Sequence, residues 1–437
     1  MSAAVNTLEH LWMPFTSNRD FKNDPRIVVR GEGVHYWTHD GNRILDGSSG
    51  LFCCALGHGR REIADAVHAQ LLELDYSLPF QGAHPGQFEL ASRVARLTPD
   101  GINRVFFVNS GSEAVDTALK IALAYHRARG DGSRMRFVSR ERAYHGVNIG
   151  GTSLSGMVKN RDAFGVGMAG VAHLRHTWLE ENRFSMGQPT EGAELADDLE
   201  RIIAMYGAET IAACFVEPIA GSTGTLVPPV GYLERLREIC DAHGVLLVFD
   251  EVITGFGRTG QPFAAQSFDV KPDIMTLAKA ITNGNQPMGA VAVSEAVYNT
   301  IVDSAPEGAV EFFHGYTYSG HPAACAAGIA TLKIYDEENI FARAAALAPY
   351  FQEQMFSLRD HPIVTDIRGY GMIAGFDIAP GSAPGVRGLE FQKKLYAAGL
   401  HIKMTGDAGI VAPPFVAETT HIDEIIGLLT EVLDTYR

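Results

Sequence analysis

Residues 245–260 read VLLVFDEVITGFGRTG, and this segment decides the fold. It opens with a run of apolar and β-branched residues, which is typical of a strand that is buried on both faces. The run ends at two carboxylates, Asp250 and Glu251, and a glycine-rich loop follows. Open α/β sheets bind their ligands at the carboxyl ends of parallel strands. The segment therefore predicts that Asp250 lies on the ligand side of such a sheet.

A second apolar run, Ile274–Leu277, is followed almost at once by Lys279. An acid at one strand end and a lysine at another suit pyridoxal phosphate (PLP), because the lysine forms a Schiff base and the acid keeps the pyridine nitrogen protonated. Each residue alone has a commoner explanation, since an aspartate after a strand is often a cap and a lysine is usually at the surface. The interpretation of Asp250 and Lys279 as a PLP site therefore depends on supporting residues elsewhere in the chain.

Strands and helices are expected to alternate from about residue 88 to residue 292. The expected strands are Val105–Val108, Arg136–Ser139, Ile211–Val216, Val245–Phe249, Ile274–Leu277 and Ala290–Val293. This pattern predicts an α/β fold with a mostly parallel sheet wrapped by helices. The length of 437 residues predicts two lobes. We expect an N-terminal arm and hairpin in residues 1–60, a large domain in 61–322 and a small α+β domain in 323–437.

Composition excludes several classes of protein. The net charge of −15 argues against a nucleic-acid or anionic-membrane partner. No apolar stretch is long enough to span a bilayer, so no membrane anchor is expected. The five cysteines are odd in number and match no disulfide or metal framework, which predicts a reducing compartment, the cytoplasm by default.

Further polar residues follow the other expected strands. Ser110 and Glu113 fit a capping box at the start of a helix, and the N–H groups of Gly111 and Ser112 are then free to hold a phosphate. A capped helix without a ligand is the simpler explanation of this motif alone. However, Tyr144 and Glu217 follow two more strands, and parallel strands end at one sheet edge. Their convergence on that edge predicts a binding site.

The chain resembles the class-III, PLP-dependent aminotransferases, and within them the ω-amino acid (β-alanine):pyruvate transaminases. The resemblance covers nearly the whole chain, and it is carried by residues 11–16 (LWMPFT), 109–113 (NSGSE), 144–146 (YHG), 249–254 (FDEVIT), 277–279 (LAK) and 314–322 (HGYTYSGHP). It implies PLP fold type I, in which a large domain with a mostly parallel, seven-stranded type of sheet joins a small α+β domain. It also implies a homodimer with shared active sites, which in turn can pair into a homotetramer.

The resemblance implies a role for each matching residue. Lys279 would be the Schiff-base lysine and Asp250 the partner of the pyridine nitrogen, so these two are the catalytic residues. The cofactor-binding set is Lys279, Asp250, Val252, Gly111, Ser112, Tyr144, Glu217 and, from the neighbouring subunit, Thr317. The substrate-binding set is Phe52, Tyr144, Tyr316, Lys403 and Trp12. No metal is expected, because none of the sixteen histidines forms a metal-binding helix motif; His145, for example, is expected at a turn or pocket edge.

Two residues depart from the family pattern. Lys403 stands where the ω-amino acid members usually have an arginine, and a lysine offers a point charge without a bidentate fork. Phe52 stands where they usually have tryptophan, which leaves more room. We therefore expect transfer of an amino group from a small-molecule amine donor to pyruvate by ping-pong kinetics, with the donor left open. The alternatives are a PLP-dependent aminomutase or racemase on the same fold and a non-catalytic PLP-fold protein.

Overall fold

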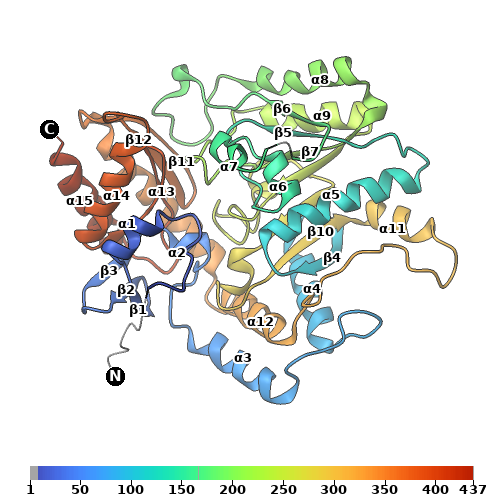
Figure 1. Ribbon diagram of the computed structural model, residues 1–437, viewed down its shortest axis with the longest axis horizontal. Helices are drawn as coiled ribbons and strands as arrows, with labels where there is room; N and C mark the ends of the chain where they lie inside the picture. The colour runs from blue at the N-terminus through green and yellow to red at the C-terminus, as the bar shows by residue number, and fades with distance from the viewer. Residues whose placement is uncertain (1–7, 166, 437) are drawn as a thin grey trace.

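Seven strands form the central sheet of the computed structural model, which describes residues 8–165 and 167–436 (Figure 1). Their order is β4-β10-β9-β8-β7-β5-β6. The strands are β4 (Ile102–Val108), β5 (Arg136–Arg140), β6 (Val171–Leu174), β7 (Ile211–Val216), β8 (Leu246–Asp250), β9 (Ile274–Leu277) and β10 (Gly289–Ser294). Only β10 runs antiparallel to its neighbours, β4 and β9. The mostly parallel sheet is therefore confirmed.

The strands at the centre of the sheet are buried on both faces. Along β7 and β8, every residue is buried, and along β8 alternate apolar residues enter two separate hydrophobic cores. Leu247 and Phe249 belong to one core, whereas Leu246 and Val248 belong to the other. This period of two explains why the segment reads as a continuous apolar run rather than as an alternating one.

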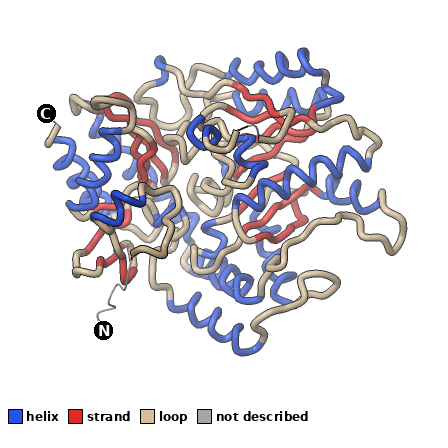
Figure 2. The backbone as a smooth tube through the Cα atoms, viewed as in Figure 1, coloured by secondary structure: helices blue, strands red, loops and turns tan. Residues whose placement is uncertain are grey.

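Helices cover both faces of this sheet, as the blue helices around the red strands show in Figure 2. The helix α5 (Gly111–Ala128) packs on β9 and β10, α9 (Tyr232–His243) packs on β8, and α4 (Pro85–Leu97) packs on β4. The other helices of the large lobe are α3 (Arg61–Glu73), α6 (Ile149–Leu154), α7 (Val158–Asp162), α8 (Asp198–Tyr206), α10 (Ala264–Ser267) and α11 (Glu295–Asp303). Helix α12 (Pro322–Glu337) packs on α3 and α4.

Segments from the N-terminal and C-terminal parts of the chain together form a smaller lobe, where blue and red elements lie side by side in Figure 1. One sheet has the order β1 (Val28–Glu32), β2 (His35–Thr38), β3 (Arg43–Asp46) and β13 (Leu400–His401). A second has the order β11 (Val364–Tyr370), β12 (Ile373–Ile378), β15 (Ala408–Val411) and β14 (Lys403–Thr405). The helices here are α1 (Asn18–Asn23), α2 (Ser49–Phe52), α13 (Ile340–Phe356), α14 (Val386–Ala397) and α15 (Thr419–Asp434).

Strand β6 was not among the expected strands, because it has only four residues and only Leu174 is fully buried. The extended segment around Ile402 forms two strands, which separate at Ile402 and belong to two different sheets. The segment before α8 is a 3-10 helix, η2 (Ala193–Asp197), and the chain becomes α-helical at Asp198. Among the described residues, no helix is long and apolar enough to cross a membrane.

Candidate active site

A buried cavity lies at the carboxyl ends of five strands, β4, β5, β7, β8 and β9. It is lined by Gly111, Ser112, Tyr144, His145, Gly146, Glu217, Asp250, Val252, Ile253, Ala278 and Lys279. Each strand delivers its residues from the loop that follows it, as expected for a ligand site in a parallel sheet. The structure thus brings together seven of the residues that the sequence singled out.

Lys279 follows β9 in a backbone conformation that side chains disfavour. Its φ is 52°, in the left-handed region, which costs about 1–2 kcal/mol for a residue other than glycine. Burial lowers the pKa of its amine, because the charged form loses its hydration. Lys279 therefore has the position and the proton affinity that a nucleophilic or basic amine needs.

Asp250 ends β8 and is held by two neighbours. Its Oδ2 lies 2.8 Å from Nδ1 of His145, and its Oδ1 accepts a hydrogen bond from the N–H of Val252 at 3.2 Å. His145 is 1% exposed, and its Nε2 has no partner among the described residues. His145 therefore lies in a loop and lines the cavity, as expected of a turn or pocket-edge residue, but its bond to Asp250 was not expected. Its place directly after Tyr144, at the edge where the site forms, was the signal that could have found it.

Glu217 is buried beside these residues, with 3% of its surface exposed. Its two oxygens accept hydrogen bonds from the N–H groups of Tyr144 at 2.9 Å and Gly221 at 3.1 Å. Burial raises the pKa of Glu217 to about 7. The pKa of Glu251 is also raised to about 7 by burial, but Glu251 points away from the cavity to cap α10, as the alternation of a strand requires.

The amino end of α5 forms a cradle in this cavity. Ser110 caps the helix by accepting the N–H of Glu113 at 3.2 Å, as expected. The carboxylate of Glu113 bonds the N–H of Asn109 rather than that of Ser110, so the second half of the capping box is displaced by one residue. A Cβ at Gly111 would come within 3.0 Å of Val252, and a Cβ at Gly146 within 2.5 Å of Ser112 Oγ. These glycines therefore let Val252 and Ser112 pack closely around the helix end, whose N–H groups suit an anion.

Strand β10 separates this cradle from Lys279. Its first residue, Gly289, pairs with Val108 of β4, and the next residue pairs with Leu277 of β9. A Cβ at Gly289 would lie 2.5 Å from the carbonyl oxygen of Ser110 and 3.0 Å from that of Leu277. Only glycine fits between the two strand ends.

A second, larger cavity borders the first along the loop that carries Phe52. Residues on either side of Phe52, including Leu51 and Cys53, line the larger cavity, while the Phe52 ring centroid lies 5.9 Å from Lys279 Nζ. Lys403 also lines this cavity, and burial lowers the pKa of its ammonium. Within residues 8–165 and 167–436, its Nζ has no hydrogen-bond or ion-pair partner. The larger cavity therefore presents one unpaired cation.

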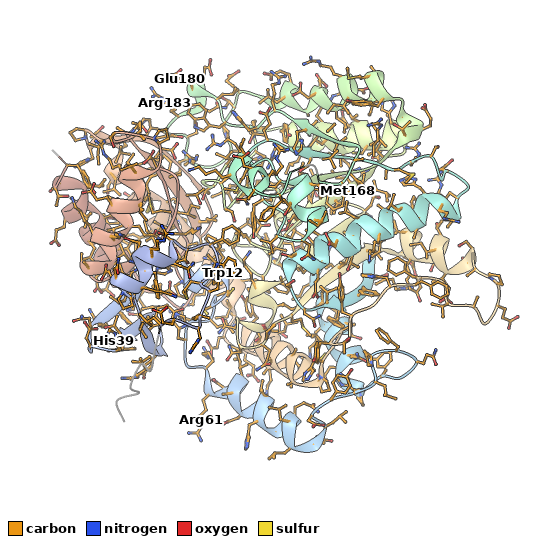
Figure 3. All side chains as sticks on the ribbon, viewed as in Figure 1. Trp12, His39, Arg61, Met168, Glu180 and Arg183 are labelled. Atoms are coloured by element: carbon orange, nitrogen blue, oxygen red, sulfur yellow. The ribbon has the colours of Figure 1, made fainter. Side chains whose placement is uncertain are left out.

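Besides Phe52, three of the expected site residues line neither cavity in the single chain. Trp12, labelled in Figure 3, is 88% exposed. Thr317 is exposed, and its carbonyl accepts the hydroxyl of Tyr76 at 2.9 Å. Tyr316 packs edge-on against the ring of His314, with centroids 4.9 Å apart. These three stay predictions that depend on a second subunit.

The chain belongs to the class-III aminotransferases, whose family model matches residues 16–433. It is 52% identical to an omega-aminotransferase of Caulobacter vibrioides over 98% of both chains. It is 47% identical to the omega-amino acid–pyruvate aminotransferase of Pseudomonas putida, over 98% of this chain and 96% of that one. The omega transaminase of Pseudomonas jessenii in complex with PMP superposes with a TM-score of 0.92 at 33% identity, over 98% of this chain and 96% of that one.

Class-III aminotransferases use PLP, and the residues of the smaller cavity fit this cofactor. Asp250 offers a carboxylate for the ring nitrogen, and Lys279 offers a buried amine for the aldehyde. The glycine-lined end of α5 offers N–H groups for the phosphate. The buried donor set and the space that Gly111 and Gly146 preserve are the structural grounds for this fit. The protein is therefore a PLP-dependent aminotransferase.

Proposed function

We propose that this chain transfers the amino group of an ω-amino acid such as β-alanine, or of another primary amine, to pyruvate and so produces L-alanine. The observation that carries the proposal is the unpaired ammonium of Lys403 in a cavity that borders the cavity of Lys279. An ω-amino acid has an amine at one end and a carboxylate at the other, so it would occupy both cavities at once. The names of the two bacterial relatives support this substrate class.

Bound PLP supplies an aldehyde that condenses with amines and a ring that accepts the electron pair released at the substrate carbon. Lys279 Nζ takes the proton from the amine-bearing carbon of the donor, and its lowered pKa keeps part of it in the neutral form that this step needs. Asp250 holds the proton on the ring nitrogen, and His145 orients Asp250. Lys403 binds the distal carboxylate.

The remaining cofactor contacts follow from the positions around the cavity. Val252 and Tyr144 are proposed to pack on the two faces of the ring, and Glu217 to lie beside it. The N–H groups of Gly111 and Ser112 bind the phosphate. Because the donor leaves as an aldehyde or ketone before pyruvate enters the same site, the two half-reactions give ping-pong kinetics.

The active unit is proposed to be a homodimer in which Thr317 and Tyr316 complete the site of the neighbouring subunit, while Trp12 lines its substrate pocket. A cluster of exposed apolar side chains supports this assembly. Phe80 is 57% exposed and packs at Gly315, and Phe313 is 89% exposed in the same loop. Large exposed apolar clusters mark surfaces that bind other proteins. Pairing of dimers into tetramers stays open within the proposal.

A cytoplasmic, reducing location is part of the proposal. All five cysteines are free thiols in the structure. Three of them, Cys214, Cys240 and Cys325, are buried. Burial without pairing is typical of a compartment in which disulfides do not form.

The absorbance spectrum of the purified protein tests the proposal. We expect a visible band from PLP bound to Lys279, which β-alanine or (S)-1-phenylethylamine removes and pyruvate restores. The Lys279→Ala variant should lack the band and the activity, whereas Lys271→Ala, at an exposed position, should keep both. A band that β-alanine and other amines leave unchanged would contradict the proposal. Formation of an isomeric or racemised amino acid without consumption of pyruvate would instead establish an aminomutase or a racemase.

A further inference from the structure

A loop from the large lobe connects the cofactor cavity to the smaller lobe. It follows β7, begins at Glu217 and ends at Leu226, and we call it the Glu217 loop. At its base, Glu217 lines the cofactor cavity and accepts the N–H of Gly221 at 3.1 Å. Further on, Ala220 and Leu226 pair as an isolated bridge and close the loop on itself. The position of its tip is thus tied to that of Glu217.

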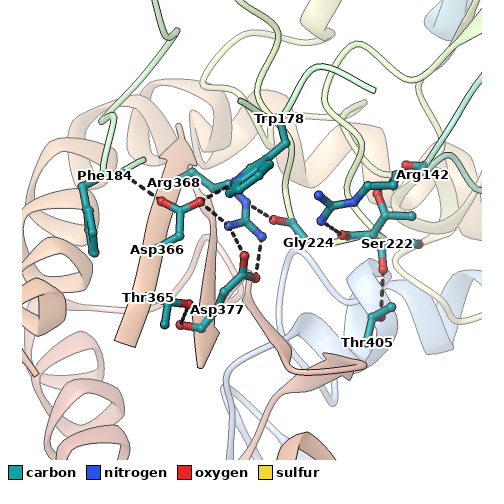
Figure 4. Close-up of polar contacts among 11 residues, drawn as sticks. Arg142, Trp178, Phe184, Ser222, Gly224, Thr365, Asp366, Arg368, Asp377 and Thr405 are labelled. Carbon is teal, nitrogen blue, oxygen red and sulfur yellow. Dashed lines mark hydrogen bonds and ion pairs between the residues drawn. The ribbon is translucent and has the colours of Figure 1, made fainter. Parts of the chain in front are cut away.

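The smaller lobe holds this loop by its backbone carbonyls (Figure 4). Thr405 of β14 donates its hydroxyl to the carbonyl of Ser222 at 2.8 Å. Arg368 of β11 donates Nε to the carbonyl of Gly224 at 2.6 Å. Gly224 has a φ of 115°. A Cβ at Gly375 of β12 would collide with the carbonyl oxygen of Gly224, so the two backbones are in direct contact. The smaller lobe therefore holds the loop by close packing as well as by hydrogen bonds.

Arg368 is itself fixed in one orientation by two acids. Its Nη1 and Nη2 bond Asp377 at 2.9 and 2.8 Å, and its Nη1 also bonds Asp366 at 2.6 Å. The remaining lone pairs of Asp366 accept the indole N–H of Trp178 at 2.9 Å and the N–H of Phe184 at 2.8 Å. A forked guanidinium with five donors in a plane is well suited to such a fixed junction.

The strand β14 links this junction to Lys403. Residues two apart on a strand point to the same face, so Lys403 and Thr405 extend in the same direction. Both are half-buried, whereas Met404 between them is buried on the other face. Since Thr405 reaches the Glu217 loop, the face that carries Lys403 is held at a fixed distance from the cofactor cavity.

We propose that Thr405 and Arg368 are positioning residues that set the distance between Lys403 and the cofactor cavity, which we call the reach. The reach would then select the chain length of the ω-amino acid donor. This inference rests on the proposed function. A donor whose amine and carboxylate match this reach satisfies both ends at once, whereas a shorter or longer donor loses one contact. A donor without a carboxylate is indifferent to the reach.

Substitution Thr405→Val tests the inference, because it removes the hydroxyl and leaves the carbonyl of Ser222 without its partner. We expect the KM of the preferred ω-amino acid in a series from β-alanine to 6-aminohexanoate to rise about fivefold, which corresponds to one lost hydrogen bond. The KM values of donors that differ by one methylene group should become more similar to one another. The KM of (S)-1-phenylethylamine and the visible absorbance of bound PLP should stay unchanged, and the melting temperature should fall by no more than a few degrees.

Thr365→Val is the matched control. Thr365 lies in the same sheet and also donates its hydroxyl to a carbonyl, that of Asp377 at 3.3 Å, but it does not contact the Glu217 loop. It should leave the length preference unchanged. Arg368→Gln should have the larger effect of the two loop-contact substitutions if it folds, and Thr405→Val keeps the test decisive if it does not.

The possible outcomes distinguish the positioning role of Thr405 and Arg368 from the proposed function. If Thr405→Val and Thr365→Val have the same length preference as the unsubstituted enzyme, the positioning role is overturned, while transfer to pyruvate stands. A rise in KM that is equal for carboxylated and carboxylate-free donors would also overturn it, since that indicates a general disturbance. If the unsubstituted enzyme transfers an amino group to pyruvate from (S)-1-phenylethylamine but from no member of the series, the positioning role is overturned. If it transfers none from either kind of donor, the proposed function itself fails.

Discussion

His145 Nδ1 lies 2.8 Å from Asp250 Oδ2, and both side chains are almost completely buried. A buried carboxylate cannot bond to water instead, so the group that donates a hydrogen bond to it fixes the rotamer of the carboxylate. His145 therefore fixes Asp250, the acid that we propose faces the ring nitrogen of the cofactor. It does so from the segment that also carries Tyr144, so one loop supplies both the proposed ring contact and the orientation of the acid.

Replacement of His145 by leucine should weaken PLP binding about tenfold, since a hydrogen bond to a charged group contributes about 1.5 kcal/mol or more. The dissociation constant of PLP, followed by the visible absorbance of the reconstituted protein, measures this effect. His145→Asn is the control, because its side-chain amide can donate from nearly the position of Nδ1. Equal affinities of the leucine and asparagine variants would show that His145 only fills space.

Replacement of Lys403 by methionine should separate two kinds of donor. We expect the KM of β-alanine to rise about ten- to hundredfold, because a charge-assisted hydrogen bond worth about 1.5–3 kcal/mol is lost. The KM of (S)-1-phenylethylamine should not rise, since this amine has no carboxylate. Lys403→Arg keeps the charge and should retain most of the β-alanine activity. Unchanged KM values for β-alanine in the methionine variant would place the carboxylate elsewhere.

Glu217 should make the stability of the PLP-free protein depend on pH. Its pKa is about 7 when folded and near its ordinary value of 4.5 when unfolded, so the folded state binds the proton more tightly. Its contribution is therefore present at low pH and is lost as the pH rises from about 4.5 to about 7.

The Glu217→Gln variant lacks this ionisation. Urea unfolding at pH 5 and pH 8 should show that its stability relative to the unsubstituted protein increases by up to about 3 kcal/mol at the higher pH. A stability difference that is the same at both pH values would show that Glu217 stays ionised when folded. Glu251 is unchanged in both proteins, so its own titration cancels from the comparison.

Phe313 should be a contact of the homodimer. Phe313→Asp places a charge in an apolar interface, so sedimentation velocity should show monomers at concentrations where the unsubstituted protein is dimeric. The PLP affinity should also fall, because Thr317 would no longer reach the neighbouring site. Met205→Asp is the control, since Met205 is 75% exposed on α8, which lies at the upper edge of Figure 1 and carries no residue of the proposed interface. A dimeric Phe313→Asp protein would assign the interface to another surface.

The core of the site could be predicted from the sequence because its chemistry lies at strand ends. Asp250 and Lys279 each follow a mostly apolar strand, and parallel strands bring such ends to one edge. His145 was missed because its partner is 105 residues away, and nothing in the local pattern shows which strand ends are neighbours. The direction of β10 was not predictable either, since an apolar strand reads the same in both directions.

Other features lie beyond what local sequence patterns contain. The break at Ile402 follows from two sheets that compete for one extended segment, which is a tertiary effect. Lys403 was singled out by comparison with a family, but its place in a cavity depends on the loop of Phe52 and on the N-terminal arm. The roles of Trp12, Tyr316 and Thr317 depend on a second subunit, which the fold of one chain does not supply.

The single strand β10 between β4 and β9 has a consequence for the cofactor. Neighbouring strands lie about 4.8 Å apart, so the phosphate cradle after β4 and Lys279 after β9 are separated by about 10 Å across the sheet. The glycine at position 289 leaves no side chain that could widen this gap. The strand spacing therefore fixes the distance between the two groups. We expect that an analogue of PLP with a longer or shorter link between ring and phosphate can bind its phosphate at the amino end of α5 or place its aldehyde at Lys279, but not both.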